Sequence, residues 1–339
     1  MEIIEESRSY DAIVTAGDRG ASKFVYGRNK VFLEIREKPL IFYVIGALEE
    51  SERVKHIHIV GPQKDLEKVF EQHGYGKKPL SIYEQQRNLY ENVWNAFLHT
   101  LPGYQEGSEF DDSLQLIAQD KAILVVPGDA PLLTPFEVDE FLSQCDLGKF
   151  DYFLGLTSED GLKPYYPDQY RRGIKLAYYH FRDERYRHNN LHLVKVLRVA
   201  NREYIQKMYD SRYQKEWKNI LKLGWEILRV QQGGIGLLKN FLSLHMANLM
   251  SRFRLEHVEP FSRVFISLPE VEATISKVLA TRFTTVNTSY GGATLDIDNE
   301  EQYEIIKENF EVWREYQYNL YKEKQITHHQ DPKKSKKTI

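Results

Sequence analysis

The sequence alternates short apolar segments with amphipathic ones, and this alternation strongly limits the folds it can adopt. Residues 11–17 (DAIVTAG), 54–62 (VKHIHIVGP) and 121–134 (KAILVVPGDAPLLT) join an apolar run to glycine, so each predicts a buried strand. Helical patterns occupy residues 39–51, 65–76, 92–101 and 135–145. Strands that alternate with helices predict a mostly parallel α/β sheet with helices on both faces. Such a sheet binds ligands beyond the carboxyl ends of its strands, where Gly17 and Asp129 are expected.

A glycine-rich, basic loop follows the first predicted strand. Its glycines and cations are Gly17, Arg19, Gly20, Lys23, Gly27, Arg28 and Lys30. Glycine lets backbone N–H groups approach a phosphate chain closely, and basic side chains neutralise its charge. The loop matches neither a Walker A sequence nor the G-x-G-x-x-G pattern, so a solvated basic loop remains the alternative.

Carboxylates occur at two further places where a hard cation could bind. Asp129 follows the most apolar predicted strand, at the strand end where a Mg²⁺ ligand is expected, although an ordinary turn aspartate is the alternative. Asp296 and Asp298 alternate on a segment that we predict to be extended, so both side chains point to one face. Either both oppose a cation, or Asp298 or Asn299 caps the helix that begins near Glu300.

Composition excludes several classes of protein. The chain has 339 residues, 42% of them hydrophobic, which is enough for a large core, and its net charge of -3 gives no indication of bulk nucleic-acid binding. Cys145 is the only cysteine, so neither an internal disulfide nor a thiolate metal cluster can form. The N-terminus lacks the apolar core of a signal peptide, and no apolar run is long enough for a membrane span. These features predict a soluble, cytoplasmic protein.

Together, these segments resemble the MobA-like and sugar-phosphate or alcohol-phosphate nucleotidyltransferases, which have a Rossmann-like fold of the glycosyltransferase-A type. The matching residues of the first motif are Ala16, Gly17, Lys23, Gly27 and Lys30, followed by Lys38-Pro39-Leu40-Ile41. GDAPLL (128–133) looks like the family's metal-binding Gly-Asp-x-Pro-Leu-Leu, and LDIDNEEQYEI (295–305) is similar to its C-terminal motif. The matches anchor about 11–140 and 285–312. Asp18 replaces the family's usual second glycine, which leaves an atypical or inactive protein as an alternative.

The resemblance implies that an acceptor phosphate or phosphonate oxygen attacks the α-phosphorus of an NTP. The products are a nucleoside-diphosphate conjugate and pyrophosphate. Lys30, with Arg19 or Lys23, is implied to stabilise charge on the triphosphate. The backbone near Ala16 and Gly17 is implied to hold the base and the phosphates.

The resemblance also implies a metal ion. Asp129, with Asp296 or Asp298, is implied to hold Mg²⁺ between the α-phosphate and the acceptor. The acceptor oxygen is already anionic, so catalysis consists mostly of positioning and charge neutralisation.

Two polar segments fall where the family places its substrates. In the segment EQQRNLYENV (84–93), Gln86 and Asn88 could read a base edge, or could belong to a polar loop and a helix cap. In RYRHNNLHLVKV (185–196), Asn190 and Lys195 could bind an anionic acceptor, or could occupy a turn and a solvated strand.

The predicted organisation is one nucleotidyltransferase domain at 10–315 and a disordered basic tail at 320–339. An acceptor-side region at about 150–285 contains a helical insertion at about 202–255. Apolar spacing in the insertion predicts a core helix or a homodimer contact. A lid or a weak contact with a membrane surface is the alternative. The expected partners are an NTP and a small phosphorylated acceptor, with no nucleic acid.

Two other functions remain open on this fold. A glycosyltransferase would use a nucleotide sugar and should carry Asp-x-Asp at the end of a central strand. Here that strand ends in Gly-Asp-Ala-Pro, and Asp-Ile-Asp occurs near the C-terminus, so the pattern favours nucleotidyl transfer. A non-catalytic nucleotide-binding protein is the third hypothesis, and it should release no pyrophosphate.

Overall fold

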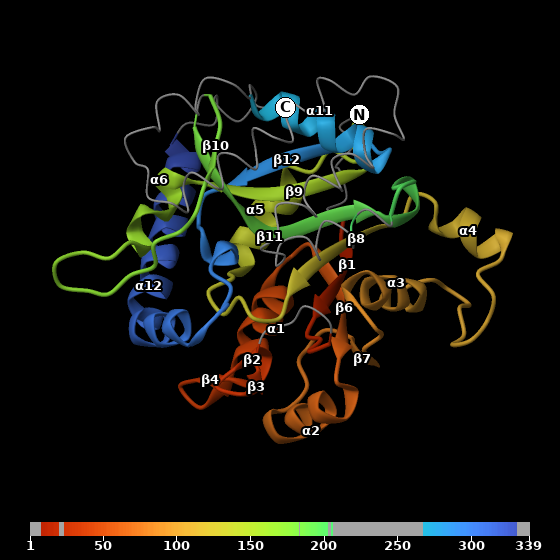
Figure 1. Cartoon of the computed structure of the whole chain (residues 1–339), viewed down its shortest axis with the longest axis horizontal. Helices are drawn as coiled ribbons and strands as arrows, with labels where there is room; N and C mark the ends of the chain where they lie inside the picture. The colour runs from red at the N-terminus through yellow and green to blue at the C-terminus, as the bar shows by residue number, and fades with distance from the viewer. Residues whose placement is uncertain (1–7, 20–23, 183, 203–204, 206–266, 331–339) are drawn as a thin grey trace, which may run out of the picture.

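The computed structural model describes residues 8–19, 24–182, 184–202, 205 and 267–330 (Figure 1). Nearly all of the predicted helical insertion, about 202–255, lies outside these residues, as does Lys23. The described part of the chain contains no helix that is both long and apolar enough to cross a membrane.

Within the described residues, an eight-stranded sheet forms the centre of the fold. Its main path runs in the order β12-β9-β11-β8-β1-β6-β7, and β10 pairs with β11. The strands are β1 (Tyr10–Thr15), β6 (Val54–Gly61), β7 (Leu80–Glu84), β8 (Ala122–Pro127), β9 (Tyr152–Ser158), β10 (Tyr179–His180), β11 (Arg185–Lys195) and β12 (Phe283–Thr288). Two small hairpins, β2-β3 (Phe24–Val25, Arg28–Asn29) and β4-β5 (Glu34–Ile35, Lys38–Pro39), follow β1.

Strand direction decides which loops share an edge of the sheet. The pairs β1/β6, β1/β8, β6/β7 and β9/β12 are parallel, whereas β11 is antiparallel to both β8 and β9. The carboxyl ends of β1 and β8 therefore meet at one edge, and the beginning of β11 reaches that same edge. This arrangement confirms the predicted mixed, mostly parallel α/β sheet.

Helices cover both faces of the sheet. The helices of the described residues are α1 (Leu40–Glu50), α2 (Gln63–His73), α3 (Leu89–His99), α4 (Asp112–Ala118), α5 (Pro135–Ser143), α6 (Glu159–Leu162), α11 (Leu268–Leu279) and α12 (Glu300–Gln330). Helices α1, α2 and α5 pack with Ala12 and Val14 of β1 on one face. Helices α3 and α11 pack with Ile13 on the other face. Alternate residues of β1 thus enter opposite cores, as expected for a strand that is buried on both sides.

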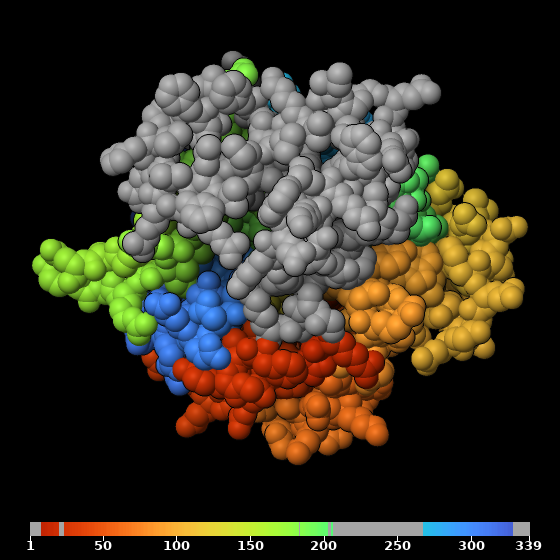
Figure 2. Space-filling view, viewed as in Figure 1, coloured from red at the N-terminus to blue at the C-terminus, as the bar shows by residue number. Residues whose placement is uncertain are grey.

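A third core joins the N-terminal hairpins to α12. It contains Ile35, Leu132, Tyr165 and Trp313, all of which are fully buried. Figure 2 shows the N-terminal hairpin segment (red) beside the beginning of α12 (blue). Tyr26 joins these two segments, because its N–H and its hydroxyl donate to two glutamates of α12. Helix α12 therefore contacts the basic loop at Tyr26 and helps to hold it in place.

Several predicted boundaries hold, and two need correction. Thr134 caps α5 through the N–H of Glu137, and Pro135 is the first helical residue, as predicted. The short strand predicted at the beginning of 294–313 is instead a 3-10 turn, Gly292–Thr294, followed by irregular chain. Helix α12 continues to Gln330, beyond the predicted beginning of the tail at 320, and residues 331–339 lie outside the described chain.

Candidate active site

Lys30 and Asp129 form an ion pair at the carboxyl edge of the sheet. Lys30 begins a 3-10 turn, Lys30–Phe32, and Asp129 follows β8. The Lys30 Nζ contacts Asp129 Oδ2 and lies 4.0 Å from Asp298 Oδ1. Only 15% of the Lys30 side chain and 11% of the Asp129 side chain are exposed, so water screens this pair weakly.

Asn29 holds Lys30 in place. Its Oδ1 accepts from the N–H of Val31, and its Nδ2 donates to the carbonyl of Ala16 at 2.9 Å. The N–H of Gly128 donates to the carbonyl of Thr15 at 2.9 Å, so the loops after β1 and β8 are also joined directly. Hydrogen bonds of the Asn29 side chain and of the Gly128 backbone thus fix the lysine opposite the carboxylate.

Asp296 and Asp298 reach the same place from the C-terminal part of the chain. The N–H of Ile297, which lies between them, donates to the carbonyl of Asp129 at 3.2 Å. Asn190 Nδ2 donates to Asp296 Oδ1 at 3.3 Å. Asn299 caps α12 by accepting from the N–H of Gln302, so the cap does not occupy the side chain of Asp298. The structure therefore gathers the three predicted carboxylates around Lys30.

The charges at this centre depend on each other. Burial raises the pKa of Asp129, and the neighbouring carboxylates of Asp296 and Asp298 raise it further against the opposing effect of Lys30. Burial would lower the pKa of Lys30, but the carboxylates outweigh it and hold that pKa above its ordinary value. Lys30 is therefore a permanent cation among acidic groups, and a cluster of this composition suits a cation and a phosphate chain together.

The residues after β1 form a tightly packed floor beside the ion pair. The N–H of Ala16 donates to Val60 as an extension of the sheet. A Cβ on Gly17 would lie 2.9 Å from Asn92 Nδ2 and 3.1 Å from Gln85 Oε1, so only glycine fits there without displacing side chains. The loop thus depends on a glycine for close packing.

Asp18 adopts an arrangement that explains its presence in a basic loop. Its N–H donates to Gln85 Oε1 at 2.9 Å, and its Oδ1 accepts from Gln85 Nε2 at 2.7 Å. This two-way pair engages Asp18 with a buried glutamine rather than with the ion pair. Sequence reasoning did not select Gln85, because a single polar residue after a strand has no distinctive pattern.

Arg19 lies apart from Lys30. Its guanidinium donates to the carbonyl of Gln85 at 2.8 Å and forms an exposed ion pair with Glu84 at 3.1 Å. It therefore lies beyond the carboxyl end of β7.

The two polar residues predicted after β7 differ in their environment. Asn88 caps α3, because its Oδ1 accepts from the N–H of Glu91 at 2.9 Å. Gln86 is half-buried, and its Nε2 donates weakly to the carbonyl of Glu84 at 3.4 Å. The helix-cap interpretation thus describes Asn88, whereas Gln86 remains near Asp18 and Arg19 at the same edge.

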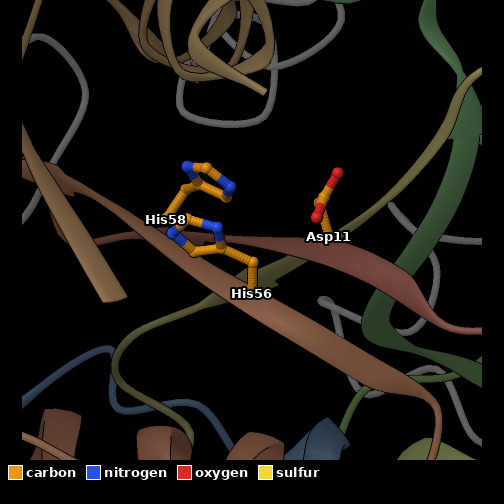
Figure 3. Close-up of side chains that lie close together, drawn as sticks. All are labelled: Asp11, His56 and His58. Carbon is orange, nitrogen blue, oxygen red and sulfur yellow. The ribbon is translucent and has the colours of Figure 1, made fainter. Parts of the chain in front are cut away.

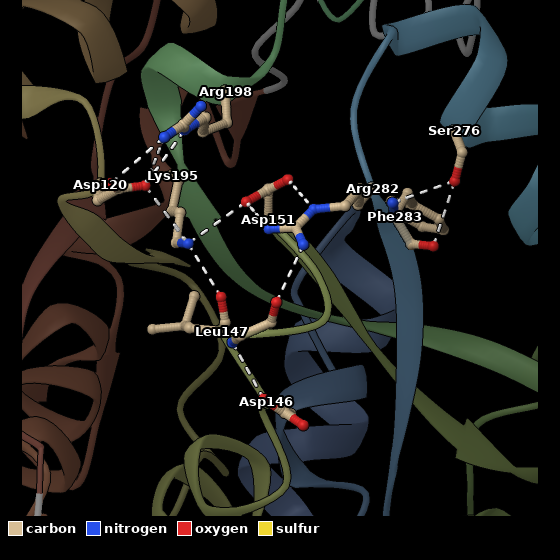
Figure 4. Close-up of polar contacts among 10 residues, drawn as sticks. Asp120, Asp146, Leu147, Asp151, Lys195, Arg198, Ser276, Arg282 and Phe283 are labelled. Carbon is tan, nitrogen blue, oxygen red and sulfur yellow. Dashed lines mark hydrogen bonds and ion pairs between the residues drawn. The ribbon is translucent and has the colours of Figure 1, made fainter.

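The two predicted acceptor residues lie at different places along β11, Asn190 in its middle and Lys195 at its end. Asn190 is at the carboxyl edge with a positive φ of 63°, a conformation that asparagine tolerates. Lys195 pairs with Ala122 at the beginning of β8, so the full length of that strand separates it from Asp129. Its Nζ donates to Leu147 at 2.9 Å and lies 3.3 Å from Asp151 (Figure 4). We therefore remove Lys195 from the candidate site, because it belongs to a buried polar network at the opposite edge.

A buried glutamate supports the C-terminal acidic loop. Glu137 of α5 accepts from the N–H of Ala293 at 2.9 Å and from the hydroxyl of Thr288 at 3.1 Å. Burial raises the pKa of Glu137 to about 7 despite these donors. Sequence reasoning did not select Glu137, because its role depends on contacts between segments that are distant in the sequence.

Comparisons with known proteins agree with this architecture. The family model of the MobA-like NTP transferase domain matches residues 12–186, just over half of the chain. A hypothetical transferase from Thermus thermophilus superposes with a TM-score of 0.58 at 21% identity, over 87% of this chain and 99% of that chain. This likeness shows a shared fold. No curated protein sequence matches the chain significantly.

Two more distant solved structures are also similar. One is the 4-diphosphocytidyl-2C-methyl-D-erythritol synthase from Anaerococcus prevotii, with a TM-score of 0.45, 12% identity, and coverage of 90% of this chain and 100% of that one. The other is CMP:2-keto-3-deoxy-manno-octonic acid synthetase in complex with CTP, with a TM-score of 0.37, 14% identity, and coverage of 68% and 87%.

Proposed function

Because the chain belongs to the MobA-like NTP transferase family and is a nucleotidyltransferase, we propose that it joins the nucleoside monophosphate of an NTP to a small phosphorylated sugar or alcohol. The observation that carries this proposal is the largely buried side chain of Lys30 between Asp129 and Asp298. It lies beside the loop after β1, at the edge where α/β sheets bind ligands.

The proposed reaction is a displacement at phosphorus. An oxygen of the acceptor phosphate forms a bond to the α-phosphorus of the NTP. The bond between that phosphorus and the oxygen leading to the β-phosphate breaks, and pyrophosphate leaves with the electron pair. Both substrates are anionic, so the protein must mainly offset charge repulsion and align the reacting atoms.

The carboxylates at this site fit a magnesium ion. Asp129, Asp296 and Asp298 offer only oxygen donors, which Mg²⁺ prefers. Their crowding also raises the pKa of Asp129, so a divalent cation would relieve the repulsion among them. We propose that these residues hold Mg²⁺, which would neutralise charge on the α-phosphate and the acceptor.

The chain's own residues perform the positioning. Lys30 would exchange part of its contact with Asp129 for the triphosphate and stabilise the leaving pyrophosphate. Asn190 holds the Asp296 carboxylate, because Asn190 Nδ2 donates to Asp296 Oδ1. The close packing at Gly17 would bring the nucleotide near the backbone. Arg19 lies at the Gln85 side of the loop, so it would meet the base or ribose end of the nucleotide, whereas Lys30 would meet the phosphates. The pairing of Asp18 with Gln85 also keeps its charge away from the phosphates, which supports an active enzyme.

Pyrophosphate release tests the proposal. The full chain is incubated with ATP, CTP, GTP or UTP, Mg²⁺ and a panel of sugar phosphates and polyol phosphates. We expect release with one preferred base and one acceptor class, and loss of release in Asp129→Asn. Lys64→Met, a change at an exposed position of α2, is the matched control and should retain activity. Absence of pyrophosphate with every NTP and acceptor would overturn the proposal and favour a non-catalytic nucleotide-binding protein.

The preferred base follows from a second measurement. A ligand that binds only the native state raises the melting temperature by mass action. Each NTP, with and without Mg²⁺, is therefore compared for its effect on the melting temperature. A nucleotide sugar is included in the same series, because stabilisation by it alone would favour a glycosyltransferase.

A further inference from the structure

A second group of potential metal ligands lies on the face of the sheet that α3 covers. Asp11 of β1 and His56 and His58 of β6 each offer one ligand atom, and these atoms lie within 4.8 Å of one another. Asp11 is paired directly with His56 across the two strands. His56 and His58 are two residues apart, so both rings project from the same face of β6. A His-x-His pair on one strand with a cross-strand aspartate is a compact arrangement for a single ion.

The ring orientations support this arrangement. Ser81 Oγ lies 3.0 Å from His56 Nε2, and Tyr83 Oη lies 3.0 Å from His58 Nδ1. Each hydroxyl engages one ring nitrogen and leaves the other. In Figure 3, one ring nitrogen of each histidine faces Asp11. Metal-binding histidines characteristically bond their second nitrogen to a neighbouring polar group, which fixes the ring and its tautomer.

Among the described residues, one of these ring nitrogens has no hydrogen-bond partner. His58 is only 2% exposed, and its Nε2 makes no hydrogen bond among the described residues. Buried polar atoms in native proteins are nearly always satisfied by protein groups, water or an ion. The atom therefore points to a missing ligand, and this observation is independent of the clustering.

Two lysines compete for the aspartate. Lys121 Nζ lies 2.7 Å from Asp11 Oδ2, and Lys55 Nζ lies 3.8 Å from Asp11 Oδ1. The Lys55 side chain is 53% exposed and can move into water, which would release Oδ1. Lys121 can remain on Oδ2 while the other oxygen binds an ion. Any ion must bind beside this positive charge, so its affinity is reduced accordingly.

We propose that Asp11, His56 and His58 bind one zinc-like divalent ion, with water as the fourth ligand. Two imidazole nitrogens and one carboxylate suit Zn²⁺ or Co²⁺ better than Mg²⁺, which prefers an all-oxygen set. Bonds of about 2.0–2.2 Å in a tetrahedron place ligand atoms roughly 3.4 Å apart, so the three groups must close inward slightly. The histidine rings stack at 4.1 Å with an angle of 23°, so the half-buried His56 ring must also turn. The ion would tie β1 to β6, and this role is independent of the proposed transfer reaction.

Titration of the full-length apoprotein with Co²⁺ and Zn²⁺ tests the proposal. We expect one equivalent of Co²⁺ to give the visible absorption bands of a tetrahedral nitrogen–oxygen site, and Zn²⁺ to displace it. Because His328 and His329 form an adjacent pair near the C-terminus, the titration uses a His328→Ala/His329→Ala background. Absence of tetrahedral bands, or binding that disappears in this background, would overturn the proposal.

Four variants locate the site and separate binding from folding. Asp11→Asn and His58→Phe should each weaken binding by more than roughly tenfold, because each removes a ligand. Tyr83→Phe should weaken it about tenfold by removing only the hydroxyl that orients His58. His99→Phe is the matched control, because the His99 ring stacks on Tyr83 at 4.3 Å but lies outside the cluster. The Co²⁺ affinity of this variant should equal that of the parent protein. Circular dichroism verifies folding, and equal affinity of folded Asp11→Asn and Tyr83→Phe with the parent would refute the site.

Lys121 supplies a test in the opposite direction. Lys121→Gln removes the cation that competes for Asp11, so Co²⁺ should bind more tightly than to the parent protein. A purely structural ion pair between Asp11 and Lys121 would give no such gain. Unchanged or weaker binding in this variant would contradict the proposed ligand set.

Discussion

Replacing Lys30 by methionine examines both the stability and the function of the candidate site. Methionine keeps much of the side-chain volume but removes the charge that faces Asp129. Loss of one partner from a buried ion pair costs about 3–5 kcal/mol, because the other charge remains buried and unpaired. Burial and the neighbouring carboxylates already raise the pKa of Asp129, so this residue can take up a proton and limit the loss. We therefore expect Lys30→Met to lower the free energy of unfolding by about 3 kcal/mol at pH 7.

A double-mutant cycle measures the pair itself. Lys30→Met, Asp129→Asn and the double variant are unfolded with urea in the absence of divalent ions. The double variant should recover most of the stability lost in Lys30→Met, because it no longer buries an unpaired carboxylate. Mg²⁺ should also stabilise Lys30→Met more than the wild type, since the ion can replace the missing positive charge.

Nucleotide binding supplies the functional half of the same test. A charge-assisted hydrogen bond contributes about 1.5–3 kcal/mol, so loss of Lys30 should weaken NTP binding by roughly ten- to a hundredfold. Isothermal titration with the preferred NTP measures this change, and Lys64→Met serves as the control. A Lys30→Met protein with wild-type stability and NTP affinity would refute the reasoning, because neither the buried pair nor the phosphate contact would then matter.

Three further predictions concern Glu137 and Asn190 beside the candidate site and Lys195 at the opposite edge of the sheet. The raised pKa of Glu137, about 7 against an ordinary 4.5, means that the folded protein holds a proton that the unfolded chain releases. Its contribution to stability is therefore full below pH 4.5, and roughly 3 kcal/mol of it is lost as the pH rises to 7. Urea unfolding across this pH range should show the loss, and the loss should be smaller in Glu137→Gln. Asn190→Gly keeps the positive φ but removes the bond to Asp296, so kcat/KM should fall about tenfold while the unfolding midpoint changes little, and a larger loss of stability than of activity would contradict this role. Lys195→Met should cost about 2 kcal/mol of unfolding free energy and leave the KM for the acceptor unchanged, whereas a raised KM would return Lys195 to the site.

The alternating strands and helices could be predicted from the sequence because the signals for each of them are local. Burial of β1 and β8 requires apolar runs, and the capping of α5 requires Thr134 followed by Pro135. Such signals lie within a few residues of each other. Nothing comparable encodes strand direction, because an alternating strand has the same pattern whether it runs parallel or antiparallel to its neighbours. The prediction for Lys195 was wrong for this reason: the antiparallel β11 carries its end away from the carboxyl edge.

The candidate site shows the same division. Asp129 was found because it follows a strand, Lys30 because it belongs to the glycine-rich basic loop, and Asp296 and Asp298 because they alternate on one segment, whereas their roles came from the family resemblance. Gln85 and Glu137 were missed, because their roles come from contacts with segments that are distant in the sequence. A buried polar residue of this kind looks like any other glutamine or glutamate until the fold brings its partners together.

The acidic loop after β12 illustrates why a site built from distant segments needs hydrogen bonds that hold those segments together. Repulsion among Asp129, Asp296 and Asp298 favours moving the loop away from the sheet. The bond from Ile297 to the Asp129 carbonyl opposes this movement, and so does the bond from Ala293 to Glu137. Both bonds are made by backbone N–H groups, so they hold the loop whatever the side chains bind. The loop would therefore stay in place if the carboxylates exchanged Lys30 for another cation, as the proposed magnesium-dependent transfer requires.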